Sequence, residues 1–213
     1  VAAAAILIAG LTVWQARRAL DTAAPTEIVT GSSELATVHL RDGSVVRLAP
    51  SSRLRIHDAS LQRDLTLDGR AYFAVAHRRG RQFVVRTRQG VARALGTRFE
   101  LASDAALMRL RVVDGRVALD APRNRVEVGA GEESAVRDSV AASPTAPRDS
   151  ITWVGNFLGF QATPLVDAAR EIERMYHARV IVDDSALQHE TITATFTDRP
   201  LDDVVRVVCS VLA

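Results

Sequence analysis

The side chains that could take part in chemistry are few, and their spacing builds no known site. The chain has five histidines, His39, His57, His77, His177 and His189. Their separations match no metal-ligand pattern, because such sites place two ligands within a few residues of each other. The one cysteine, Cys209, lies in an apolar run. It can therefore form neither a disulfide nor a cysteine-based metal site, and we expect it to be a small buried residue.

The acidic pairs do not indicate catalysis either. Asp183-Asp184 and Asp202-Asp203 are adjacent residues. Neighbours in a strand point to opposite faces, and acidic residues at a helix start interact favourably with the helix dipole. The sequence also lacks the phosphate-binding loop, the nucleophile elbow and the dinucleotide-binding motif. Because no nucleophile is paired with a base, we predict no conventional enzyme, no metal site and no cofactor.

The charge distribution argues against nucleic-acid binding. The chain has 27 basic and 25 acidic residues, a net charge of +2, and every basic residue is an arginine. A nucleic-acid surface needs a basic stripe with interleaved aromatic residues. Here the arginines are scattered, and the cluster at 78–81 is typical of a solvated turn.

Residues 26–137 predict an all-β unit. Short runs of alternating polar and apolar residues mark half-buried strands. They cover residues 36–40, 45–48, 54–56, 64–67, 71–75, 82–85, 109–113 and 125–128. Three Asp-Gly pairs, Asp42-Gly43, Asp68-Gly69 and Asp114-Gly115, separate such runs and suit type I′ turns. The pattern does not distinguish a sandwich from a solenoid-like stack of β-layers.

The rest of the chain predicts a linker and a small α+β unit. Residues 138–150 are small and proline-containing, which is typical of a linker. Residues 151–213 predict the order β-α-β-β-α, with strands at 157–160, 178–182 and 191–196 and a second helix at 202–212. Thr163 before Pro164 predicts an N-cap for the first helix. The motif Thr-Pro-Leu returns as Arg-Pro-Leu at 199–201, 36 residues later, and suggests a duplicated βα unit.

Residues 1–18 are predicted to be part of a transmembrane helix and its flank. Val1 to Trp14 is almost wholly apolar, shorter than the roughly 20 residues that a membrane span needs, and it starts without a methionine. Trp14 would lie at the membrane interface. Two alternatives stay open: a signal peptide, which would need a basic region before the apolar run, and a buried helix. Arg17 and Arg18 run against the positive-inside trend if the following residues are extracytoplasmic.

Several motifs, in order, resemble those of the FecR family. The matching stretches are residues 38–54, 67–75, 83–87, 94–99 and 113–119. The C-terminal unit is similar to the STN-type (secretin and TonB short N-terminal) domain that ends many family members. Together these matches cover most of residues 26–213, and their number and order make the resemblance specific.

The resemblance implies a regulator that crosses the inner membrane once and lies mostly in the periplasm. Its periplasmic part would receive a signal from the N-terminal signalling domain of a TonB-dependent outer-membrane transporter, often one for iron chelates. A cytoplasmic segment, absent from this sequence, would bind an extracytoplasmic-function sigma factor. The alternative is a structural or glycan- or peptide-binding module of the cell envelope.

The resemblance also implies a candidate chemical step at Gly96-Thr97. Some relatives cut themselves once at a Gly-Thr bond in this region. The Thr97 hydroxyl would attack the Gly96 carbonyl, and water would open the resulting ester. The other interpretation, which the sequence favours, is that Gly96 makes a turn and Thr97 begins a strand.

Three aromatic residues near the linker are candidate partner contacts. They are Trp153, Phe157 and Phe160. Aromatic side chains dominate the energetics of protein interfaces, and strand edges of such a unit could accept a partner strand. The alternative is that the three residues form the core of the C-terminal unit.

Overall fold

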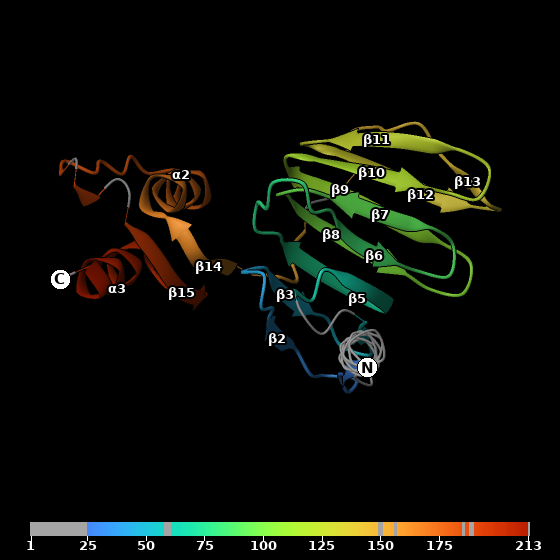
Figure 1. The fold of residues 1–213 in the computed structure, drawn as a ribbon, viewed down its shortest axis with the longest axis horizontal. Helices are drawn as coiled ribbons and strands as arrows, with labels where there is room; N and C mark the ends of the chain where they lie inside the picture. The colour runs from blue at the N-terminus through green and yellow to red at the C-terminus, as the bar shows by residue number, and fades with distance from the viewer. Residues whose placement is uncertain are drawn as a thin grey trace, which may run out of the picture.

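The computed structural model describes residues 25–57, 61–148, 151–155, 157–184, 186–187 and 190–212. The predicted membrane segment, residues 1–18, lies outside these described residues. Within them, no helix is both long enough and apolar enough to cross a membrane. The chain forms a β unit (residues 25–148) and a C-terminal unit (residues 151–212), which Figure 1 shows at opposite ends of the long axis.

The β unit is a two-layered arrangement of strands. The strands are β1 (Thr26–Val29), β2 (Ala36–His39), β3 (Val45–Leu48), β4 (Arg53–Ile56), β5 (Asp64–Ala74), β6 (Phe83–Arg86), β7 (Val91–Ala94), β8 (Arg98–Ser103), β9 (Met108–Asp114), β10 (Arg116–Asp120), β11 (Arg125–Gly129), β12 (Glu132–Arg137) and β13 (Val140–Ala141). One layer contains β1, β4, β6, β7, β10 and β11, and the other contains β2, β3, β8, β9, β12 and β13. The mainly β fold class is confirmed, with sandwich-like layers rather than a solenoid.

Strand β5 joins the two layers. Its first half pairs with β4 and β6, and its second half pairs with β3 and β8. The change occurs at Gly69, which has φ +105° and would place a Cβ 2.5 Å from Ser52 Oγ. A strand that changes sheets at a bend is a known way to make the corner of a sandwich.

The prediction of type I′ turns at the Asp-Gly pairs was therefore wrong in two respects. Asp68-Gly69 lies inside β5, and Asp114-Gly115 connects strands in different layers rather than a hairpin. A type I′ turn requires positive φ at both central residues. All three glycines have positive φ, but none of the three aspartates does. Only Asp42-Gly43 links a hairpin, β2–β3.

The core of the β unit lies between the layers. Alternation positions the side chains: in β4 the two arginines are exposed, while Leu54 and Ile56 are buried. Phe73 of β5 is central, because its ring stacks on Phe99 at 4.9 Å and meets Phe83 edge-on at 5.9 Å. The predicted linker begins later than expected: β13 pairs with β12, and Thr145 exchanges backbone hydrogen bonds with Glu133.

The C-terminal unit consists of two βα pairs. They are β14 (Phe157–Pro164) with α2 (Leu165–Tyr176), and β15 (Thr191–Thr197) with α3 (Leu201–Leu212). β14 and β15 are antiparallel, and one face of this sheet shares a core with both helices. Both helices begin at the leucine after a proline, so the predicted duplication of the βα unit fits the structure.

Two local predictions for this unit were wrong. No strand forms at 178–182 in the structure: the Val180 N–H donates to Glu173 Oε1 instead of to a neighbouring strand, and Ile181 is exposed. Thr163 is not the N-cap of α2, because β14 continues to Pro164, which occupies that position without a side-chain cap.

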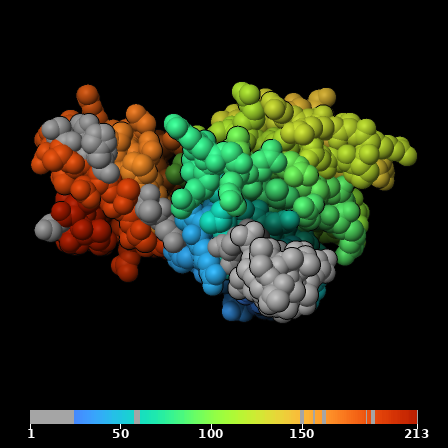
Figure 2. Space-filling model, in the orientation of Figure 1, coloured from blue at the N-terminus to red at the C-terminus, as the bar shows by residue number. Residues whose placement is uncertain are grey.

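The two units contact each other through the β14–β15 sheet. Residues of β14 alternate, with Leu158 and Phe160 facing the helices and Phe157 lying against Val45 and Tyr72 of the β unit. Gly159 completes this contact, since a Cβ on it would lie 3.2 Å from Val45 Cβ. The space-filling view shows the C-terminal unit, in orange and red, resting on one end of the β unit (Figure 2).

Candidate functional site at the cleft between the two units

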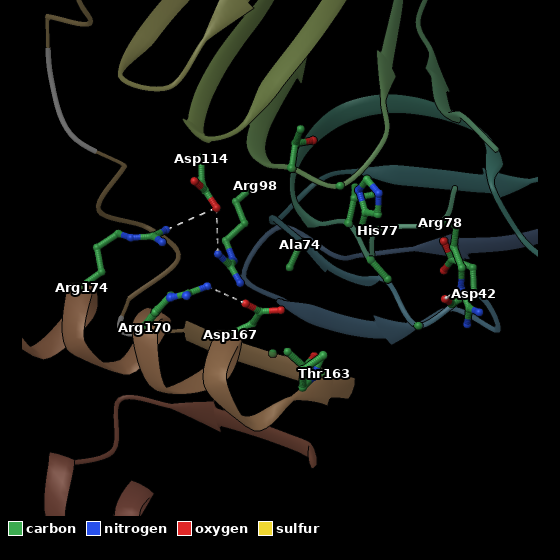
Figure 3. A pocket seen from close by; sticks show the side chains of 17 residues that line it. Asp42, Ala74, His77, Arg78, Arg98, Asp114, Thr163, Asp167, Arg170 and Arg174 are labelled. Carbon is green, nitrogen blue, oxygen red and sulfur yellow. Dashed lines mark hydrogen bonds and ion pairs between the residues drawn. The ribbon is translucent and has the colours of Figure 1, made fainter. Parts of the chain in front are cut away.

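A cleft of about 680 Å³ separates one rim of the β unit from helix α2. The β-unit wall includes His77, Gly96, Thr97, Arg98 and Asp114. The opposite wall comes from the end of β14 and from α2, where Asp167, Arg170 and Arg174 face the β unit (Figure 3). The cleft therefore brings the Gly96-Thr97 bond together with charged side chains from both units.

Gly96 and Thr97 lie at the bend between β7 and β8. Gly96 makes the bend, as the ordinary interpretation of the sequence held, but β8 begins at Arg98, one residue after Thr97. The Thr97 side chain, however, is 5% exposed, and its Oγ1 is buried without a hydrogen-bond partner. Buried hydroxyls are nearly always hydrogen-bonded, so this one needs an explanation.

The segment that carries His77 is fixed opposite Gly96. The Val75 N–H donates to the Thr97 carbonyl at 2.9 Å, and the Arg78 N–H donates to the Leu95 carbonyl at 3.4 Å. His77 lies between these two bonds. An ideal Cβ on Gly96 would lie 2.8 Å from His77 Nδ1 and 2.7 Å from His77 Cβ, so the histidine packs directly on the Gly96 Cα. Only glycine fits at position 96 without moving the imidazole.

A buried ion pair holds the two loops of this site in place. The Arg63 guanidinium pairs with Asp42, and both side chains are almost fully buried. Arg63 also donates to the carbonyls of Ala76 and Leu95, at 3.2 and 3.4 Å, which directly precede His77 and Gly96. Asp42 in turn accepts two hydrogen bonds from Ser44. One guanidinium therefore sets the positions of both loops.

Gly115 closes the site from the other side. Its φ is +82°, and a Cβ there would lie 2.7 Å from Thr97 Cγ2 and 3.1 Å from the Gly96 carbonyl oxygen. A side chain at this position would press on both residues of the candidate bond. The glycine at the crossing from β9 to β10 thus leaves the space that the Thr97 side chain occupies.

Ion pairs connect the two walls of the cleft. Arg98 pairs with Glu171 of α2 and, at 3.2 Å, with Asp114, which also lies 3.4 Å from Arg174 of α2. Burial raises the pKa of Glu171 to about 7, although Arg98 and Arg174 act in the opposite direction. Desolvation therefore outweighs the attraction of the two arginines, and Glu171 is uncharged in part of the population near neutral pH.

The three candidate aromatic residues face inward. Phe160 is fully buried and meets Phe196 edge-on at 6.3 Å in the C-terminal core. Phe157 is 3% exposed and packs on Tyr72 of the β unit. Trp153 donates its indole N–H to Glu100, and Arg70 lies over its ring at 5.3 Å. Phe160 thus belongs to the core, as the alternative interpretation held, while Trp153 and Phe157 contact the β unit.

Cys209 is exposed, and the prediction of a buried cysteine was wrong. It lies on the exposed side of α3, one helical turn from the exposed Val205. Among the described residues, no group of histidine, cysteine, aspartate or glutamate side chains could hold a metal ion.

Comparisons with known proteins agree with this architecture. The family model described as FecR protein matches residues 26–118, and the model described as FecR, C-terminal, matches residues 157–213. The chain belongs to the FecR family. Two crystal structures of a candidate anti-sigma factor from Parabacteroides distasonis ATCC 8503, at 1.65 and 2.50 Å resolution, are similar to it. Each has a TM-score of 0.56 and 26% sequence identity, and the match covers 87% of this chain and 91% of the other. No curated protein matches the chain.

FecR-family membership and the anti-sigma-factor-like neighbours support a regulatory role for this chain. The C-terminal match begins with β14, whereas the FecR match ends within β10, before β11, β12 and β13 complete the β unit.

Most of the residues around the Gly96-Thr97 bond carry no local sequence signal. His77 was noted only as one of five histidines, and Arg63 was not singled out. Asp42 and Gly115 were assigned to turns. The only sequence signal for Gly115 was the Asp-Gly pair itself, because the contacts that join these residues come from strands distant in sequence.

Proposed function

We propose that this chain is the signal-receiving, periplasmic part of an inner-membrane regulator of the FecR type. It would relay a signal from a TonB-dependent outer-membrane transporter, of the kind that takes up iron chelates, to an extracytoplasmic-function sigma factor. The C-terminal unit, which we propose to be STN-like, would receive the transporter's N-terminal signalling domain.

The observation that carries this proposal is the way the C-terminal unit rests on the β unit. Among the described residues its small sheet consists of β14 and β15, so a partner strand can add to an edge. The same sheet docks on the β unit through one apolar cluster around Val45, Tyr72 and Phe157 and through the Arg98–Glu171 pair. A partner that competes for this sheet would separate the two units and expose Trp153 and Phe157.

A binding experiment tests the proposal. The N-terminal signalling domain of the cognate transporter is immobilised and presented with residues 151–213, with residues 25–213 and with residues 25–148. We expect the first two to bind and the third, which lacks the C-terminal unit, to stay in solution. If neither residues 151–213 nor residues 25–213 bind the signalling domain, the proposal is wrong.

We also propose that the chain cuts itself once between Gly96 and Thr97. Thr97 Oγ1 would bond to the Gly96 carbonyl carbon, and the C–N bond would break to leave an ester and the free amine of Thr97. Water would then hydrolyse the ester to the Gly96 carboxylate and restore the Thr97 hydroxyl. The buried, unpartnered hydroxyl of Thr97 supports this step, since no competing hydrogen bond holds it.

The cut chain would remain one folded body. Strand β8, which follows the cut, pairs with β5 from Gly69 to Ala74, and β10 pairs with β7. Backbone pairing therefore joins the two fragments after the covalent bond is lost. This arrangement is suited to a relay, because force or partner binding can separate strands that are no longer covalently joined.

Mass spectrometry under denaturing conditions tests the cleavage. We expect the wild-type chain to give two fragments that split after Gly96, although they elute together under native conditions. Thr97→Ala should stay intact, and Thr97→Ser, which keeps the hydroxyl, should be cut. A single intact wild-type chain, indistinguishable from Thr97→Ala, would rule the cleavage out.

A further inference from the structure

The inference concerns His77, and it rests on the proposed self-cleavage. The reaction needs a group that accepts the proton of the Thr97 hydroxyl, because an unionised hydroxyl is a weak nucleophile. Histidine most often serves this purpose in proteins. Among the titratable residues that line the cleft, His77 is the one packed against the residue whose carbonyl is attacked.

Backbone hydrogen bonds and a buried guanidinium fix this contact. The bonds from Val75 to Thr97 and from Arg78 to Leu95 flank His77 and hold its segment, which follows β5, beside the candidate bond. Arg63 binds the carbonyls that precede His77 and Gly96. The imidazole is therefore placed by the core of the β unit, although the His77 side chain itself is exposed to the cleft.

We propose that His77 is the proton acceptor for Thr97 in the acyl shift. Its ring nitrogen takes the proton from Thr97 Oγ1 once a rotation of the two side chains brings them within hydrogen-bond distance, because Oγ1 has no hydrogen-bond partner in the structure, and Oγ1 then bonds to the Gly96 carbonyl carbon. The same proton passes to the Thr97 nitrogen as the C–N bond breaks. His77 ends unchanged, the ester carries no extra charge, and the later hydrolysis consumes one water.

The test follows cleavage of the full chain after a pulse of cell-free synthesis. His77→Ala and His77→Gln should cut about 100-fold or more slowly than wild type, the size expected for loss of a general base. The control is His57→Ala, which removes an exposed histidine hydrogen-bonded to Thr66 at the far end of β5 and should cut at the wild-type rate. Melting curves identify any variant that does not fold, and His77→Gln, with similar volume, serves if His77→Ala fails.

Two added reagents locate the step. Imidazole should restore cutting to His77→Ala, because the cleft admits it to the vacated position. Hydroxylamine, which opens esters, should accelerate the wild type and leave His77→Ala slow, because in that variant formation of the ester is the slow step.

Each contrary result has a distinct meaning. Wild-type rates in both His77 variants would overturn the role of His77 and leave self-cleavage standing. Proton transfer by His77 would also be overturned if imidazole did not restore cutting to a slow but folded variant. The same holds if hydroxylamine did restore it. An intact wild-type chain would overturn the proposed cleavage and this inference together.

Discussion

The two units of the molecule differ in the extent of their buried apolar cores. The β unit has a deep core in which strands from both layers meet, with Phe73, Phe83 and Phe99 fully buried. The C-terminal unit has a two-stranded sheet and two helices, and α3 exposes Val205, Val207 and Val211. A unit with fewer buried apolar contacts opens more easily, whereas a continuous core keeps its loops in one geometry.

This difference assigns different tasks to the two units. A bond that is to be cut needs neighbours held in fixed positions, and the β unit supplies them through Arg63, Asp42 and the strand pairing around β5. A unit that receives a partner must be able to leave its docking site. The C-terminal unit docks through a small apolar cluster and through the Arg98–Glu171 contact, where burial disfavours the charged form of Glu171.

The largest expected effect is the loss of the buried ion pair in the β unit. Asp42→Ala leaves the Arg63 guanidinium buried without its carboxylate, which costs about 3–5 kcal/mol in the free energy of unfolding. Urea denaturation of the β unit measures it. Asp68→Ala, which removes an exposed carboxylate in β5, should change the same free energy by about 0.5 kcal/mol or less. Equal effects of the two substitutions would show that Arg63 is not anchored as described.

The next largest effect is a change with pH in the stability of the contact between the two units. Since the pKa of Glu171 is raised from 4.5 to about 7, its contribution to the stability of the docked form is complete below pH 4.5. The contribution falls as pH rises through 7, by up to about 3 kcal/mol. Glu171→Gln, which cannot ionise, should remove this dependence and be the more stable form at pH 8.

Hydrogen exchange of α2 amides between pH 5 and 8, corrected for the intrinsic exchange rate, measures this change. The control is Asp167→Asn, which alters an exposed carboxylate on the same helix and should keep the wild-type pH dependence. A pH-independent wild type would show that Glu171 is not desolvated at the interface.

A smaller effect comes from overpacking the contact between the units. A Cβ at Gly159 lies 3.2 Å from Val45 and 3.3 Å from Phe157, so Gly159→Ala should weaken docking by about 1 kcal/mol. Faster proteolysis of the linker would report it. At Gly31 the nearest atom to an added Cβ is 3.6 Å away, so Gly31→Ala should leave the linker as resistant as in wild type. Unchanged proteolysis of Gly159→Ala would mean that the contact yields without cost.

The sequence predicted the strands well where a local pattern determined them. Alternation located β4 to within a residue, because one face of that strand is buried. The apolar pattern also located β3, although all four of its residues are buried. The corner in β5 was missed, because Asp68-Gly69 has the local chemistry of a turn and only pairing with β4 and β8 makes it a strand. The prediction of a strand at residues 178–182 was wrong for the converse reason, since an apolar run forms no strand without a partner strand.

The candidate site was predictable only in part. The motif indicated Gly96 and Thr97, but their neighbours come from the turn before β3, the segment after β5 and the crossing after β9. No spacing along the chain connects His77 with Gly96 or Gly115. Their proximity follows from strand pairing, which sequence patterns of single elements do not specify.

A disulfide across the docking contact tests most directly whether the C-terminal unit must leave the β unit to receive its partner. Val45→Cys with Gly159→Cys places two Cβ atoms about 3.2 Å apart, slightly closer than the roughly 3.5–4.5 Å usual in a disulfide, and Cys209→Ser removes the exposed competing thiol. Binding to the transporter's N-terminal signalling domain is measured for the oxidised and the reduced protein. We predict that the oxidised form binds about ten-fold or more weakly and that reduction restores the wild-type affinity. Equal affinity of the two forms would contradict release of the C-terminal unit as the receiving step.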